Sequence, residues 1–169
     1  MIEQNQDATL ILAPLGAQGT PRLWLGNKKA AADTEFLTRA GIDVVFNCTK
    51  DLPFAAQIPH QYRVPVDDNL EPQEIQNMLA WSPEIIAKLM KEYKRGGVIL
   101  VHCHAGMQRS AAVVAMFIIA LTGQPAEKVM GFIRYKRPIA FFPEANFKQA
   151  ILGFEKQLRA EMHSRTHNI

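Results

Sequence analysis

The fold of this chain is decided by nine residues at positions 102–110, which read HCHAGMQRS. The apolar run VILV at 98–101 precedes them and is typical of a buried strand, and the apolar run at 111–121 that follows favours a helix. The first N–H groups of a helix have no partners within the helix, and the helix dipole adds positive potential there. A short loop between a strand and a helix start therefore indicates a cradle for an anion.

Two side chains give this cradle its chemistry. Cys103 lies at the mouth, where we expect the sulfur to be ionised and therefore nucleophilic at neutral pH. Arg109 can direct two N–H groups at two phosphate oxygens, which lysine cannot do. Gly106 permits a close backbone approach. We expect phosphate to be bound by the backbone amides of His104, Ala105, Gly106, Met107, Gln108 and Arg109.

These residues predict an enzyme that removes phosphate through a cysteinyl-phosphate. Ser110 can donate its hydroxyl to the departing sulfur, and His102 is expected to hydrogen-bond backbone and support the loop. A leaving alkoxide or phenoxide needs a proton, which a carboxylic acid above the loop can supply. Asp67 and Asp68 are the two candidates, because they directly follow a predicted strand.

Composition indicates a soluble, intracellular globular domain. The chain has 169 residues, 48% hydrophobic and 21% charged, and its net charge of +3 suits an anionic substrate. It has no long Lys/Arg run, so we expect no nucleic-acid binding. Its two cysteines form no disulfide framework, and its first residues lack a signal-peptide pattern. The longest apolar run, 111–121, is well short of the roughly 20 residues that span a membrane. We therefore expect a cytoplasmic or nuclear protein without membrane contact.

Strands and helices are predicted to alternate along the chain. We expect strands at 23–26, 43–48, 62–66 and 98–102, and helices at 28–40, 72–94, 109–122, 126–135 and 144–163. Pro83 predicts a kink or a restart in the second of these helices. Alternation favours an α/β fold: a central, mostly parallel twisted sheet of four to five strands with helices on both faces. We divide the chain into a flexible lead-in (1–20), a catalytic domain (21–163) and a tail (164–169).

The pattern Cys-x5-Arg-Ser within residues 102–110 resembles the signature of the cysteine-dependent protein tyrosine phosphatases. Shorter similarities to the dual-specificity branch of that family occur at 23–26 (LWLG), 30–37, 41–49 (GIDVVFNCT), 64–68 (VPVDD) and at Arg137, Pro138, Pro143 and Phe147. The resemblance spans about 22–158 and implies a protein tyrosine phosphatase-like fold. It also implies a shallow pocket open to phosphoserine, phosphothreonine and phosphotyrosine, and it puts the general acid at Asp68.

Two residues depart from the family pattern. Gln108 stands where many members have serine, and Glu144 stands where asparagine is usual. The departure at Glu144 affects a hydrogen bond to the loop and not the chemistry. Cys48 is expected to be a core residue. The alternative, implied by family members with a cysteine at the matching place, is a protective disulfide with Cys103, which makes Cys48 a candidate redox partner.

Several alternatives stay open. Arg134, Lys136 and Arg137 form either an exposed helix end or a patch that steers acidic substrates. The HCH string at 102–104 could suggest a metal, but alternate residues of a strand point to opposite faces and no second ligand group follows. No metal or cofactor is therefore expected.

The leading functional expectation is a dual-specificity protein phosphatase whose partner is a phosphorylated protein. One alternative is a phosphoinositide or RNA 5′-triphosphate phosphatase that uses the same loop. Another is a non-catalytic phospho-binding module. The oligomeric state stays open.

Overall fold

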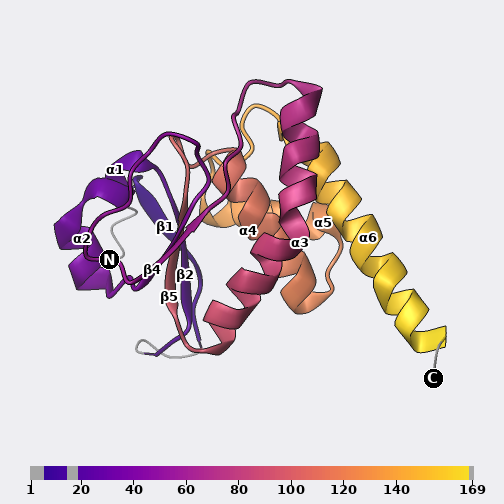
Figure 1. Cartoon of the computed structure of the whole chain (residues 1–169), viewed down its shortest axis with the longest axis horizontal. Helices are drawn as coiled ribbons and strands as arrows, with labels where there is room; N and C mark the ends of the chain where they lie inside the picture. The colour runs from indigo at the N-terminus through magenta and orange to yellow at the C-terminus, as the bar shows by residue number, and fades with distance from the viewer. Residues whose placement is uncertain (1–5, 15–18, 168–169) are drawn as a thin grey trace.

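The computed structural model describes residues 6–14 and 19–167, and its centre is a five-stranded sheet (Figure 1). The strand order is β1-β2-β5-β3-β4, and only β1 runs antiparallel to its neighbour. The strands are β1 (Ala8–Leu12), β2 (Arg22–Gly26), β3 (Val44–Asn47), β4 (His60–Arg63) and β5 (Val98–His102). The predicted α/β fold with a mostly parallel sheet is confirmed.

Helices cover both faces of this sheet (Figure 1). Two short helices, α1 (Lys28–Ala32) and α2 (Thr34–Ala40), lie on one face. The other face carries α3 (Pro72–Lys94), α4 (Arg109–Thr122), α5 (Ala126–Lys136) and α6 (Lys148–His167). Alternate residues of a strand point to opposite faces. Leu23 and Leu25 of β2 accordingly join the core under α3–α6, while Trp24 packs with α1 and α2.

The position of β5 sets the position of the site. It lies between β2 and β3, and His102 at its end pairs with Gly26 and Asn47 at the ends of those strands. The three parallel strands thus finish at one edge, where ligands bind in open α/β sheets. The loop that follows β5 leads directly into α4, which is buried from Arg109 through Ile119.

Both predicted chain ends were wrong in part. The lead-in 1–20 contains β1, because Ala8 and Ile11 reach the core while the backbone pairs with β2. The tail 164–169 is helical as far as His167, since α6 continues through it. Residues 1–5, 15–18 and 168–169 lie outside the described residues, and the division into domains stays a prediction.

Two further elements differ from expectation. The single helix predicted at 28–40 is two helices, because Asp33 adopts an extended conformation and its carboxylate accepts the N–H of Phe36 as the N-cap of α2. The strand predicted at 62–66 lies at β4, His60–Arg63, and ends before Pro65, whose missing N–H suits a strand terminus.

Of the two outcomes predicted at Pro83, a kink or a restart, the restart is wrong because α3 is continuous through that residue. Proline has no N–H to donate to the carbonyl four residues earlier, which here belongs to Leu79. The Ser82 hydroxyl donates to that Leu79 oxygen at 2.6 Å instead. Ser82 therefore bonds the carbonyl that Pro83 leaves free, and does not cap a new helix.

Candidate active site

The loop 103–108 connects β5 to α4 and carries the buried thiol of Cys103. The Cys103 Sγ lies 3.1 Å from the Oγ of Ser110, which is in the first turn of α4. No described side chain caps this helix start, so its first N–H groups remain available to an anion. The structure thus brings sulfur, hydroxyl and helix N-terminus together at the edge of the sheet.

Arg109 opens α4 and is 7% exposed. Its Nη1 donates to the carbonyl oxygen of Val66 at 3.0 Å, which fixes one edge of the guanidinium to the segment before Asp67 and Asp68. Its Nε is buried and has no hydrogen-bond partner among the described residues. Buried donors are normally paired, so this N–H is suited to an incoming oxyanion.

Arg137 holds the loop from behind. It is 2% exposed, its Nε donates to Gly106 O at 2.9 Å, its Nη2 lies 3.5 Å from Ala105 O, and its Nη1 donates to Thr9 Oγ1 at 3.0 Å. Burial lowers the pKa of this guanidinium. Because loop carbonyls are bound on this side, the loop N–H groups are left to face the other. Arg137 was predicted to belong either to an exposed helix end or to a steering patch, and both predictions are wrong because its side chain is buried. Arg134, of the same predicted cluster, is exposed.

Gly106 is required by the same contact. Its φ is +68°, in the left-handed region, and an added Cβ would lie 2.6 Å from Gly26 O and 2.7 Å from the Arg137 Nη2. Only glycine lets the loop lie against β2 and Arg137 at once.

His102 is buried, whereas His104 is partly exposed. The His102 Nδ1 lies 3.4 Å from Cys103 O, and because a carbonyl only accepts, this contact needs the proton on Nδ1. Burial lowers the pKa of His102 to about 4, so the ring is neutral at physiological pH. His104 Nε2 lies 3.1 Å from the carboxylate of Asp51 on the surface.

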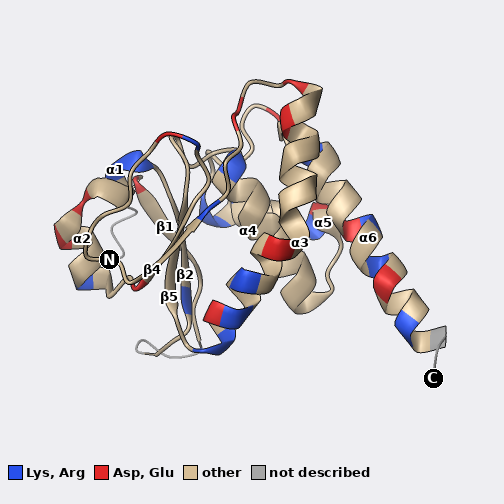
Figure 2. Ribbon diagram, viewed as in Figure 1, with Lys and Arg blue, Asp and Glu red and all other residues tan. Residues whose placement is uncertain are grey.

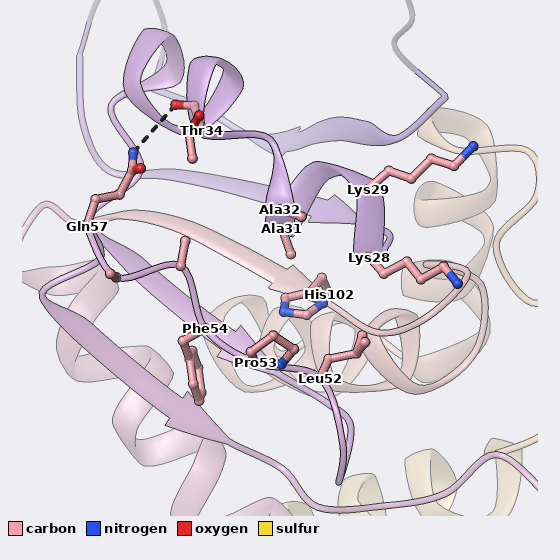
Figure 3. Close-up of a pocket in the computed structure, with 12 residues that line it drawn as sticks. Lys28, Lys29, Ala31, Ala32, Thr34, Leu52, Pro53, Phe54, Gln57 and His102 are labelled. Atoms are coloured by element: carbon pink, nitrogen blue, oxygen red, sulfur yellow. Dashed lines mark hydrogen bonds between the residues drawn. The ribbon is translucent and has the colours of Figure 1, made fainter.

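An apolar cavity of about 680 Å³ adjoins His102 (Figure 3). Figure 3 shows its walls coming from α1 and from the segment after β3, with His102 between them and Lys28 at one end. The backbone N–H of Lys28 donates to His104 O at 3.0 Å, so this wall is attached directly to the loop.

The two candidate acids have different surroundings. Asp67 is half-buried, with its carboxylate 3.0 Å from Lys50 Nζ and its backbone N–H donating to Glu74 at 2.7 Å. That N–H, followed by the Lys50 ammonium, lowers the pKa of Glu74. Asp68 is exposed, and its Oδ1 accepts the side-chain N–H of Asn146 at 2.9 Å.

Gln108 connects the loop to the segment before α6. Its Nε2 donates to Phe142 O at 3.1 Å and to Glu144 O at 2.8 Å, and its Oε1 accepts the N–H of Asn146 at 2.9 Å. Glu144 thus contacts the loop through its backbone carbonyl. Sequence reasoning missed Arg137 and Asn146 as parts of the site. The only signal was the position of both in the stretch 137–147.

Cys48 is fully buried and free, as is Cys103. Its backbone N–H donates to His102 O at 2.8 Å, at the paired ends of β3 and β5. Burial raises the pKa of Cys48 well above its usual value, with a further rise from Cys103 and an opposing effect of Arg109. Cys48 is therefore a core thiol, and its pairing with Cys103 stays a prediction.

Charges are mixed over the rest of the surface. Figure 2 shows lysines and arginines interleaved with acidic residues along α3 and α6. Within the described ranges, no three His, Cys, Asp or Glu side chains are grouped to hold a metal ion. No helix in that part of the chain is long and apolar enough to cross a bilayer.

Comparison with known proteins places this site in a family. The model of the dual specificity phosphatase catalytic domain matches residues 23–157. Dual specificity phosphatase 28 of Mus musculus is 31% identical over 150 residues, 88% of each chain. Dual specificity protein phosphatase 16 of Homo sapiens is 30% identical over 141 residues, 82% of this chain and 20% of that protein.

Solved structures agree. The crystal structure of human DUSP28 superposes with a TM-score of 0.73 at 28% identity and covers 89% of this chain and 95% of that one. The chain spans only 20% to 40% of the length of several other curated relatives, among them the phosphatases numbered 16, 8 and 4. With the family model matching most of its length, the chain belongs to the dual specificity phosphatase family.

Proposed function

We propose that this chain hydrolyses phosphotyrosine and phosphoserine or phosphothreonine in proteins through a phosphate ester on Cys103. The observation that carries the proposal is the pairing of a buried thiol, 3.1 Å from Ser110 Oγ, with a buried Arg109 whose Nε lacks a partner among the described residues. The nucleophile contacts Ser110 in the first turn of α4, and the anion-binding donor belongs to Arg109 in the same turn, so both adjoin the start of that helix. Family membership supports the same chemistry.

In the first step, the Cys103 sulfur attacks phosphorus, and an S–P bond forms as the P–O bond to the leaving group breaks. The amides of 104–109 and the Arg109 guanidinium bind the three other oxygens. The leaving oxygen takes a proton from Asp68. We assign this role to Asp68 because Asp67 is already paired with Lys50.

In the second step, water attacks the phosphorus and gives a proton to the Asp68 carboxylate. The S–P bond breaks, inorganic phosphate forms, and Asp68 is protonated again. The Ser110 hydroxyl donates to the sulfur as its negative charge returns, which stabilises the leaving thiolate.

A tetrahedral oxyanion suits this cradle. A mouse putative dual specificity phosphatase, 27% identical with a TM-score of 0.73, was crystallised with zinc tungstate, and tungstate has the shape of phosphate. Protein substrates are favoured over highly charged phosphoinositides because the loop adds no second cation beyond Arg109. Its one other titratable side chain besides Cys103, His104, is paired with the carboxylate of Asp51.

A side-by-side assay tests the proposal. Phosphotyrosyl, phosphoseryl and phosphothreonyl peptides, a phosphoinositide and 5′-triphosphate RNA are each incubated with the chain, and released phosphate is measured. We expect turnover of the peptides, no turnover by Cys103→Ser, and peptide binding retained by that variant. Faster turnover of lipid or RNA would contradict the protein substrate, and binding without any turnover would leave a phospho-binding module.

Location is a separate proposal. The two free thiols suit the reducing cytoplasm or nucleus. Imaging of the tagged chain in its host cell tests this, and an accumulation in a secretory compartment would contradict it.

A further inference from the structure

The proposed general acid lies on an irregular stretch of chain that is exposed from Asp68 onward. Residues 64–71 form neither helix nor strand, and the side chain of Asp68 is exposed. A proton donor must lie within hydrogen-bond reach of the leaving oxygen, so its geometry has to be fixed from outside. The structure contains contacts that do this.

Asn146 bonds Asp68 directly. Its Nδ2 donates to Asp68 Oδ1 at 2.9 Å, across 78 residues of sequence. An amide N–H can donate to this oxygen whether the acid is protonated or ionised, provided the acid's proton is on Oδ2. The contact therefore persists through both steps and directs the other oxygen, Oδ2, to the leaving group and then to water.

Gln108 fixes Asn146 in turn. The Oε1 of Gln108 accepts the backbone N–H of Asn146 at 2.9 Å, while its Nε2 donates to Phe142 O and Glu144 O. The Gln108 side chain is 6% exposed, and all its amide functions are engaged. A backbone bond from Phe141 N to Met107 O, 2.8 Å long, attaches the same segment to the loop.

Gln108 also belongs to the loop itself, since its backbone N–H is among those expected to bind phosphate. Gln108 is thus expected to bind the phosphate through its backbone N–H, while its side chain bonds Asn146, the residue that bonds Asp68. The spacing between phosphate and Asp68 is set by this short series of bonds.

We propose that Asn146, held in place by Gln108, is the positioning residue of the general acid Asp68. This inference rests on the proposed function, because it assigns how the acid of that reaction is oriented. It makes leaving-group protonation, and not phosphate binding, the step that depends on Asn146.

The test compares two aryl phosphates. 4-Nitrophenyl phosphate has a leaving group that needs little protonation, whereas phenyl phosphate needs a well-placed acid. The measured quantity is the kcat/KM for 4-nitrophenyl phosphate divided by the kcat/KM for phenyl phosphate, determined for the wild-type chain and for Asn146→Ala. We expect the ratio to rise roughly tenfold in Asn146→Ala, in line with a partial loss of the 10²- to 10⁴-fold that acid catalysis supplies. A loss of folding or of phosphate binding lowers both values alike and leaves the ratio unchanged.

Two further variants make the comparison sharp. Gln149→Ala removes an exposed amide side chain three residues further along, which bonds neither Gln108 nor Asp68, and should leave the ratio unchanged. Gln108→Ala should raise the ratio, and combining it with Asn146→Ala should add nothing, because the two act in series. Additive effects would contradict that series.

Asp68→Asn separates this inference from the proposed function. If Asp68→Asn raises the ratio and Asn146→Ala does not, the positioning role is wrong while the acid stands. If Asp68→Asn leaves the ratio flat, the acid assignment itself is wrong.

Discussion

Replacing Arg137 by methionine should destabilise the fold and disable the loop together. Methionine fills a similar volume, so the change removes hydrogen bonds without opening a large cavity. The lost bonds run to Gly106 O at 2.9 Å and to Thr9 Oγ1 at 3.0 Å, with a weaker contact to Ala105 O at 3.5 Å. Each buried carbonyl left without a partner costs about 1–3 kcal/mol, partly offset because a charge no longer has to be buried.

We therefore expect Arg137→Met to lower the free energy of unfolding by about 3 kcal/mol, which is a fall in Tm of roughly 6–12 °C for a chain of this size. Thermal and urea unfolding measure the stability, and binding of orthovanadate measures the loop. The matched control is Lys136→Met, an exposed neighbour on α5 that should change stability by no more than about 0.5 kcal/mol. An Arg137→Met variant as stable as that control, with vanadate binding intact, would refute the assignment of Arg137 to the loop.

Three further outcomes follow from the site. Gly106→Ala should fold poorly or lose vanadate binding, because its Cβ would lie 2.6 Å from Gly26 O; a stable, fully active variant would contradict the close approach. Because the pKa of His102 is about 4 in the folded chain against 6.5 ordinarily, the unfolded chain binds more protons between those values. The free energy of unfolding should therefore increase by up to roughly 3 kcal/mol as the pH is raised across that window. In urea unfolding at several pH values, His102→Gln should flatten this dependence. Mild peroxide separates the two roles of Cys48: a family-like redox partner forms a Cys48–Cys103 disulfide with release of water, seen by non-reducing peptide mapping, whereas a core residue leaves Cys103 to oxidise irreversibly without a bridge.

The loop and its helix could be predicted from sequence because their residues are contiguous. The apolar residues that make α4 buried lie in one run, and the helix starts and ends where expected, at Arg109 and Thr122. Strand β1 could not be predicted in the same way. It is short and lies at the sheet edge, with only Ala8 and Ile11 buried, so its stability comes from pairing with β2.

The supports of the site are long-range, and that is why sequence reasoning missed them. Arg137 reaches Gly106 across 31 residues, and Asn146 reaches Gln108 across 38. Arg137 is also at the end of a helix, where a cation has an obvious surface role with the helix dipole. The preference for Asp68 over Asp67 came only from the family resemblance. The contact of Asp67 with Lys50 now gives that preference a physical reason.

The proposed reaction requires Cys103 to carry the phosphoryl group during turnover. Mixing the chain with 4-nitrophenyl phosphate, quenching in acid within the first turnover and mapping the peptides by mass spectrometry tests it directly. We expect one phosphoryl group on the peptide containing Cys103, and none on that peptide from Cys103→Ser. Steady turnover with no phosphoryl group on Cys103, or undiminished turnover by Cys103→Ser, would contradict it.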